Sequence, residues 1–69
     1  MSDFLTRLVI EHDELREKQM KLQAFLSTEN FSKVDPTQQV LLKIQVSAME
    51  TYRAILENRI TLLSPQQSN

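Results

Sequence analysis

Residues 4–26, FLTRLVIEHDELREKQMKLQAFL, decide the fold of this 69-residue chain. Within them, seven positions recur at alternating steps of three and four residues, which is the spacing of a heptad seam along one face of a helix. No glycine or proline interrupts the stretch, so we predict one helix over about residues 4–27. The seam positions are Leu5, Leu8, His12, Leu15, Gln19, Leu22 and Leu26.

A second helical segment follows a short polar break at residues 27–34. Asp35-Pro36 restarts the helix, because proline suits the first helical turn and Asp35, three residues before Gln38, resembles a capping box. This helix is predicted over about residues 36–63, and Phe31 and Val34 are expected to fold back over the end of the pair. The pattern predicts an all-α fold, an antiparallel two-helix hairpin of residues 1–63, followed by a flexible C-terminal tail over residues 64–69.

The composition excludes several classes of site. The chain has no cysteine, no glycine and a single histidine, which argues against disulfides, zinc sites, thiol catalysis and phosphate-binding glycine loops. Its net charge of −1 argues against a duplex-DNA or membrane-surface partner. No apolar run is long enough to span a bilayer. We expect a soluble intracellular protein that is not an enzyme and holds no metal or cofactor.

The second helix carries adjacent apolar residues that cannot all face the first helix. Neighbours in such a pair lie ~100° apart around a helix, so one member faces the other helix and the second member needs a different partner. We therefore predict a compact homo-oligomeric bundle that buries a second stripe. The pairs are Leu41-Leu42, Ile55-Leu56 and Leu62-Leu63.

His12 lies on the heptad seam, where a polar residue can set the register of two helices. A catalytic role would need an acid or base beside it, and Glu11, Asp13 and Glu14 are expected to project from other faces. We interpret His12 as structural. Gln19 and Gln45, near the middle of each helix, are interpreted in the same way, as register-setting hydrogen-bonding residues.

Charged residues of the first helix allow two interpretations. Glu14–Lys18 and Glu17–Lys21 have the order that favours ion pairs one turn apart on an exposed face. Alternatively, Lys18 or Lys21 reaches across a subunit boundary towards an anion. Spacing alone leaves both open.

Arg59 is expected on the apolar face of the second helix, where an unpaired charge would be costly. Antiparallel packing predicts that Arg59 lies beside Phe4 and Arg7. A phenylalanine next to two arginines is suited to stacking and holding a phosphorylated base. An intersubunit salt bridge to Glu57 or Asp3 is the equally weighted alternative.

Two stretches are more specific than helical periodicity. The first is Arg7-Leu8-x-x-Glu11-x-x-Glu14-Leu15-x-x-Lys18-x-x-Lys21-Leu22-x-Ala24-Phe25-Leu26. The second is Gln39-x-Leu41-Leu42-x-x-Gln45-x-x-Ala48-Met49-x-x-Tyr52-x-x-Ile55-Leu56-x-x-Arg59-Ile60. With Phe31 between them, they resemble the helical hairpin domain of phage anti-CBASS cyclic-oligonucleotide sponges, which phage anti-Thoeris sponges share. The resemblance covers about residues 4–62.

This resemblance implies a phage counter-defence protein in the cytoplasm of the infected bacterial host. Such sponges bind and sequester cyclic di- and trinucleotide second messengers, such as cyclic GMP-AMP and cyclic tri-AMP, without cleaving them. CBASS immunity is then not activated. The resemblance also implies a homo-oligomer, typically a homohexamer. The alternative is a non-catalytic helical-hairpin homo-oligomer that acts as an assembly or adaptor factor with no small ligand.

The resemblance also implies binding residues. The matching positions for a cyclic dinucleotide pocket at a protomer boundary are Phe4 and Lys18, with Lys21 as the neighbouring alternative. For a separate cyclic trinucleotide pocket the match is Arg59. Arg7 is added to that pocket because hairpin geometry predicts that it lies beside Arg59.

Overall fold

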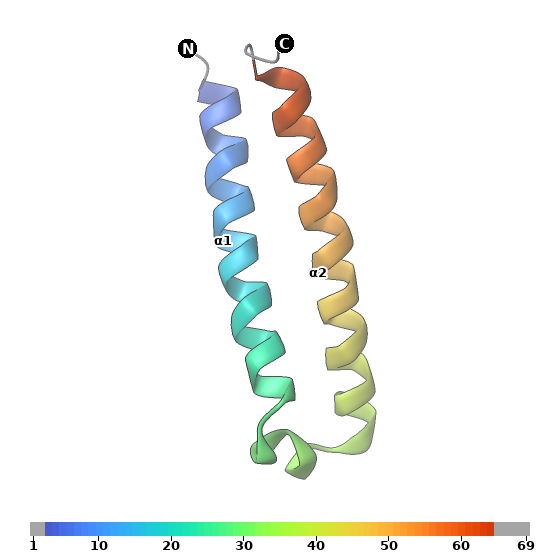
Figure 1. Cartoon of the computed structure of the whole chain (residues 1–69). Coiled ribbons are helices and arrows are strands. Elements are labelled where there is room, and N and C mark those ends of the chain that lie inside the picture. The colour runs from blue at the N-terminus through green and yellow to red at the C-terminus, as the bar shows by residue number, and fades with distance from the viewer. Residues whose placement is uncertain (1–2, 65–69) are drawn as a thin grey trace.

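The structure is a computed structural model that describes residues 3–64. Two helices, α1 (Asp3–Leu26) and α2 (Pro36–Leu63), are joined by a turn that contains a short 3-10 helix, η1 (Glu29–Lys33). The helices run antiparallel and side by side, with the turn at one end of the hairpin (Figure 1). The predicted all-helical hairpin is therefore confirmed. Of the predicted tail over residues 64–69, all but Ser64 lies outside the described residues.

The turn at residues 27–34, expected only as a polar break, has a defined structure because side chains form hydrogen bonds with its backbone groups. The Thr28 hydroxyl donates to the carbonyl of Phe25 at 2.6 Å and accepts from the backbone N–H of Phe31 at 3.3 Å. The side-chain amide of Gln39 donates to the carbonyl of Val34 at 2.8 Å. Phe31 is buried and meets Phe25 edge to face, with ring centroids 5.9 Å apart. Phe31 thus closes the turn end of the hairpin, as predicted.

The start of α2 follows its sequence signals. The Asp35 carboxylate accepts hydrogen bonds from the backbone N–H groups of Thr37 at 3.1 Å and Gln38 at 3.4 Å. Pro36 occupies the first turn, where its missing N–H costs nothing. Asp35 therefore caps α2, and this part of the prediction is confirmed.

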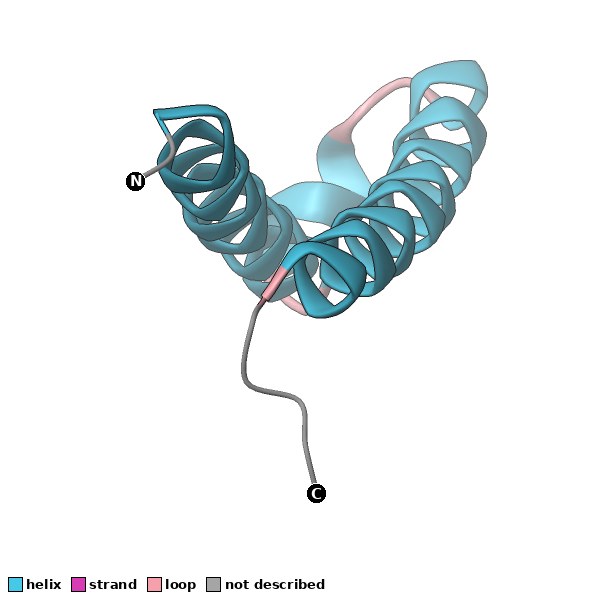
Figure 2. Cartoon of the chain, turned by 90° about the horizontal axis from the view of Figure 1, so that it is seen from above, coloured by secondary structure: helices cyan, strands magenta, loops and turns pink. Residues whose placement is uncertain are grey.

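The core lies along the predicted seam of α1. Leu8, Leu15 and Leu56 form its buried centre, with Met49 and Ile60 packed against them. Burying a side chain of this size contributes about 1.5–3 kcal/mol. All seven predicted seam positions of α1 are buried or half-buried, which confirms the seam. The two helices are inclined to each other when viewed from above (Figure 2).

The residues of α2 that meet this seam form the inner stripe, which has the same alternating spacing of three and four residues. Val46, which the sequence analysis did not assign to the apolar face, is one of its buried members. All members are buried or half-buried. The inner stripe consists of Gln39, Leu42, Val46, Met49, Arg53, Leu56 and Ile60.

A second set of α2 residues repeats this spacing about 100° further around the helix. Each of them is exposed in the single chain. Leu56 is 0% exposed, whereas its neighbour Ile55 is 51% exposed, so adjacent residues do face different directions. At the end of the helix both Leu62 and Leu63 are exposed. The outer stripe consists of Leu41, Gln45, Ala48, Tyr52, Ile55, Arg59 and Leu62.

Within residues 3–64, neither helix combines the length and the apolar character that crossing a membrane requires.

Candidate functional site

One broad face of the hairpin holds every residue that was predicted to bind a ligand. On α1, six exposed residues at alternating steps of three and four form the α1 flank. Two contacts join this flank to the outer stripe of α2: Arg59 lies over the Phe4 ring, and the Tyr52 hydroxyl donates to the Glu11 carboxylate. The flank and the outer stripe together form the binding face. The α1 flank consists of Phe4, Arg7, Glu11, Glu14, Lys18 and Lys21.

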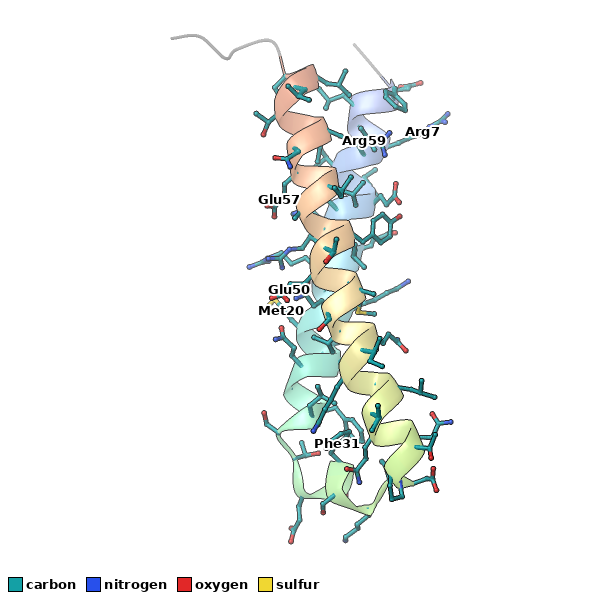
Figure 3. All side chains as sticks on the ribbon, turned by 90° about the vertical axis from the view of Figure 1, so that its right-hand side faces the viewer. Arg7, Met20, Phe31, Glu50, Glu57 and Arg59 are labelled. Atoms are coloured by element: carbon teal, nitrogen blue, oxygen red, sulfur yellow. The ribbon has the colours of Figure 1, made fainter. Side chains whose placement is uncertain are left out.

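The end of the binding face nearest the chain termini carries an aromatic ring and cations. The Arg59 guanidinium lies 5.8 Å from the centroid of the Phe4 ring, a cation–π geometry. Phe4 is nevertheless 54% exposed. Arg7 extends from α1 at the same end of the hairpin (Figure 3). The antiparallel packing thus brings Phe4, Arg59 and Arg7 to one end, as hairpin geometry predicted.

Arg59 differs from its prediction in one respect. It belongs to the outer stripe with Tyr52 and is exposed, whereas Leu56 belongs to the inner stripe. Its charge therefore remains hydrated, and no burial cost requires an ion pair. Within the chain, Glu57 contacts His12 and Arg53.

Lys18 and Lys21 lie on the middle of the α1 flank. Lys21 pairs with Glu17 at 3.5 Å, whereas Lys18 forms no hydrogen bond or ion pair within residues 3–64, so the predicted Glu14–Lys18 pair does not form. Lys18 lies fourteen residues beyond Phe4 on the continuous α1 helix, about 21 Å at ~1.5 Å per residue. Within one chain, Lys18 therefore lies far from the Phe4–Arg59 pair.

His12 ties the two helices together. Its Nε2 lies 2.8 Å from the Glu57 carboxylate on α2, and its Nδ1 lies 3.1 Å from the Asp13 carboxylate. The hydrogen bond to Glu57, followed by that to Asp13, raises the pKa of His12. The hydrogen bond from His12 lowers the pKa of Glu57. The expectation that Asp13 projects from another face is wrong, because its short side chain turns back to the adjacent imidazole.

Gln19 is the buried polar residue of the seam. It is 3% exposed, and among the described residues its Oε1 atom has no hydrogen-bond partner. An unsatisfied buried acceptor costs about 1–3 kcal/mol. Gln45 is exposed on the outer stripe. Gln19 Oε1 therefore does not form the register-setting hydrogen bond that was expected of it. Gln45 lies outside the seam and does not form one there either.

A depression with a volume of about 460 Å³ lies on α1 alone. It contains Lys21 but none of the other predicted binding residues. Because one helix forms its whole lining, it is an open hollow. Its lining residues are Asp13, Arg16, Glu17, Met20, Lys21 and Ala24. Within residues 3–64, no group of three or more histidine, aspartate or glutamate side chains is arranged to hold a metal ion.

Tyr52 is a member of the binding face to which the sequence analysis gave no binding role. Its ring is half-exposed, and its hydroxyl donates to Glu11 across the two helices. The signal was present in the sequence: Tyr52 lies seven residues before Arg59 and eleven after Leu41, so all three share one heptad stripe.

The comparisons with known proteins agree with this hairpin. A family model described as Sequestin matches residues 2–62. No curated protein and no solved structure shows a significant match. The family name denotes sequestration, in accord with the resemblance to sponge proteins. Since the matched region covers nearly the whole hairpin, this chain belongs to the Sequestin family.

Proposed function

We propose that this protein sequesters cyclic di- and trinucleotide second messengers without cleaving them. In this proposal it is a phage counter-defence protein, it acts in the cytoplasm of the infected bacterial host, and it blocks activation of CBASS immunity. It works as a homo-oligomer, which in the proteins that it resembles is typically a homohexamer. Membership of the Sequestin family supports sequestration, and the binding face supports this class of ligand.

The observation that carries the proposal is the exposed Phe4–Arg59 pair. A cyclic oligonucleotide combines flat bases with phosphodiesters, so its pocket needs an aromatic or apolar plane beside fixed cations. Phe4 offers the plane for the dinucleotide. Arg59 and Arg7 offer guanidinium groups at the same end of the hairpin (Figure 3), and their flat faces can themselves stack on a base. We assign Arg59 and Arg7 to the cyclic trinucleotide.

Lys18 supports a second pocket. Within residues 3–64 its ammonium group has no carboxylate partner, so a phosphate can bind it without displacing an ion pair. We assign Lys18 and Phe4 to the cyclic dinucleotide, with Lys21 as the alternative cation. Lys21 must first release Glu17, which makes Lys18 the better candidate.

A binding role without cleavage is consistent with the state of His12. Hydrolysis of a phosphodiester needs a group that activates water. Both ring nitrogens of His12 are engaged by carboxylates, one from each helix. The imidazole therefore holds the helices together, and we propose a binder rather than an enzyme.

Isothermal titration against a panel of cyclic di- and trinucleotides tests this function. We expect tight binding, and recovery of intact nucleotide after the complex is denatured. Lys18→Ala should weaken dinucleotide binding, and Arg59→Ala should weaken trinucleotide binding, each leaving the other ligand unaffected. Lys33→Ala, on η1 and away from the binding face, is the matched control. If no ligand in the panel gives a heat of binding, the proposal is refuted. If the recovered nucleotide is hydrolysed, the protein is not a binder that leaves its ligand intact.

A second candidate function is an assembly or adaptor factor with no small ligand. The exposed apolar members of the outer stripe favour it, because such patches mark protein contacts. The same titration separates the two functions. A protein that assembles but binds no cyclic nucleotide is an adaptor.

A further inference from the structure

The two ends of the hairpin are held together differently. At the turn end, the chain itself joins α1 to α2, and the buried Phe31 ring packs against Phe25. The Lys43 ammonium group lies 5.9 Å from the centroid of the Phe31 ring, which adds a contact from α2 to the turn. The turn end can therefore separate only if the turn itself unfolds.

The other end, which we call the open end, holds the first turns of α1 and the last turns of α2 (Figure 1). Within residues 3–64, no apolar residue nearer this end than Leu8 and Leu56 is buried. Leu5 and Ile60 are half-buried, and Leu63 is 46% exposed. Because local stability depends on buried apolar contacts, the open end should open more readily than the rest of the hairpin.

A polar clamp of His12, Glu57 and Asp13 lies where the buried core ends. The Nε2 atom of His12 lies 2.8 Å from the Glu57 carboxylate on the other helix, and its Nδ1 atom lies 3.1 Å from the Asp13 carboxylate. Glu57 directly follows the buried Leu56, and the His12 side chain is only 15% exposed. The polar clamp therefore joins α1 to α2 at the inner limit of the open end.

The polar clamp is complete only when its imidazole is protonated. An ionised carboxylate only accepts hydrogen bonds, a neutral imidazole has one N–H donor, and an imidazolium has two. Carboxylate oxygens lie beside both ring nitrogens of His12, so the neutral ring donates to one of them and presents a lone pair to the other. The hydrogen bond that remains is weaker, because it no longer involves a charged donor.

We infer that the polar clamp is a pH-sensitive switch that holds the open end closed while His12 is protonated and lets it separate when that proton is lost. The switch acts on the first turns of α1 and the last turns of α2. The turn end keeps its own contacts, none of which includes His12. Opening is therefore local and does not require the whole hairpin to unfold.

The charged groups around the polar clamp set the pH range of the switch. The hydrogen bond to Glu57 of α2, followed by that to Asp13 of α1, raises the pKa of His12 from its ordinary value of 6.5. The hydrogen bond from His12 lowers the pKa of Glu57, and the charges of Arg53 on α2 and Arg16 on α1 add to this effect. The open end is therefore held closed between these two pKa values, and it is released as pH rises through the pKa of His12.

The consequence for the ligand rests on the proposed function. Phe4 and Arg7 belong to the α1 side of the open end, and Arg59 belongs to its α2 side. Separation of the helices moves Arg59 away from Arg7 and breaks its contact with the Phe4 ring. The proposed trinucleotide site should therefore bind its ligand less tightly as pH rises above neutral.

Hydrogen exchange of the intact protein, measured by mass spectrometry of its peptides, tests the switch. After correction for the intrinsic exchange rate, the protection of residues 5–11 and 57–63 should fall as pH rises above 6.5. The expected fall is roughly 2- to 10-fold, the size of one net hydrogen bond. Protection of residues 38–46 should stay constant. An equal fall in both regions overturns the switch, because it indicates unfolding of the whole hairpin.

Two variants make this test specific to His12. His12→Gln keeps a polar side chain at the seam without a titrating ring, so its open end should exchange faster than that of the wild type at acidic pH and change no further as pH rises. Tyr52→Phe removes a different cross-helix hydrogen bond, the one to Glu11, and is the matched control that should keep the wild-type pH dependence. A pH-dependent fall in protection that persists in His12→Gln overturns the switch.

Titration of a cyclic trinucleotide over the same pH range tests the consequence for the ligand. The wild type should lose affinity above neutral pH by the same roughly 2- to 10-fold, whereas the affinity of His12→Gln should not change with pH. If the open end opens and the wild-type affinity stays constant, the switch does not control the site. If no trinucleotide binds at any pH, the proposed function fails, and hydrogen exchange still decides whether the switch exists.

Discussion

The inner and outer stripes of α2 have the same heptad spacing and different surroundings. Leu56 on the inner stripe is 0% exposed, and Ile55, the next residue, is 51% exposed on the outer stripe. α1 covers the first stripe and not the second. Heptad spacing therefore identifies which residues share a face, while the number of helices present determines whether that face is buried.

The comparison also explains why this hairpin is expected to need a partner. Within residues 3–64 the buried apolar residues are few: Leu8, Leu15, Phe31, Val46 and Leu56. The middle of the seam contains Gln19 with an unsatisfied acceptor. A chain of this length seldom obtains more than about 3–5 kcal/mol from its own core. In the proposed homo-oligomer, burial of the outer stripe between copies would supply further apolar contact.

Leu56→Ala should give the largest effect on stability. Truncating a fully buried leucine costs about 2–5 kcal/mol, enough to unfold much of a marginal hairpin. Urea unfolding followed by circular dichroism should show this loss at every protein concentration. For Ile55→Ala the loss should appear only at concentrations where the wild type is assembled. Equal losses at all concentrations would remove the distinction between the stripes.

Ile55→Glu should separate assembly from folding. A glutamate in the outer stripe would be buried without a partner in the oligomer, a cost that prevents association. Native mass measurement should find a monomer where the wild type is oligomeric. Ala54→Glu, exposed and away from both stripes, is the control that keeps the wild-type mass. An unchanged mass for Ile55→Glu would show that the outer stripe is not an interface.

Much of the fold was predictable, because it depends on local signals. The heptad seam of α1, the Asp35-Pro36 start of α2 and the closure by Phe31 are encoded within a few residues of each other. The 3-10 helix was not predicted, since it depends on how the hydroxyl of Thr28 and the amide of Gln39 are oriented by the completed turn. Polar side chains alone indicated only a break.

The candidate site was partly predictable. Antiparallel geometry placed Phe4 beside Arg59, and the structure confirms that contact. Sequence analysis assigned Arg59 to the apolar face of the second helix and missed that it lies on the exposed outer stripe, whereas Leu56 lies on the buried inner stripe. The Asp13–His12 hydrogen bond was also missed. It depends on side-chain rotation, which residue spacing does not encode.

On the α1 flank, Lys18→Ala should reduce ligand affinity without reducing stability. Loss of a charge-assisted phosphate contact should cost roughly 1.5–3 kcal/mol of dinucleotide affinity, a factor of about 10 to 150 in Kd. Stability should change by no more than ~0.5 kcal/mol, because the side chain is exposed. Titration calorimetry and thermal unfolding measure the two quantities, with Lys33→Ala as control. If Lys18→Ala keeps the wild-type affinity, Lys21 becomes the candidate for the phosphate contact.

The pH dependence of stability should give the smallest effect, and it reports on the inner contact between the helices. The raised pKa of His12 means that its contribution is fully present below its ordinary value of 6.5 and is lost as pH rises through the higher folded value. The lowered pKa of Glu57 means that its contribution is present above about 4.5 and is lost as pH falls. The melting temperature of the wild type should therefore decline above neutral pH.

His12→Gln provides the control for that pH profile. It removes the titrating group while keeping a polar side chain at the seam, so the decline above neutral pH should flatten. Asp13 and Glu57 face the imidazole from α1 and α2, and Arg53 approaches Glu57 at 3.6 Å. A profile that is identical in the wild type and in His12→Gln would exclude His12 as its source.

Native mass spectrometry of the wild type with a cyclic dinucleotide and a cyclic trinucleotide together tests the central claim most directly. We predict one homo-oligomer that carries both ligands at once, each with the mass of the intact cyclic molecule. A monomer without ligand, or a bound nucleotide heavier by one water molecule, would contradict sequestration by an assembled, non-catalytic hairpin.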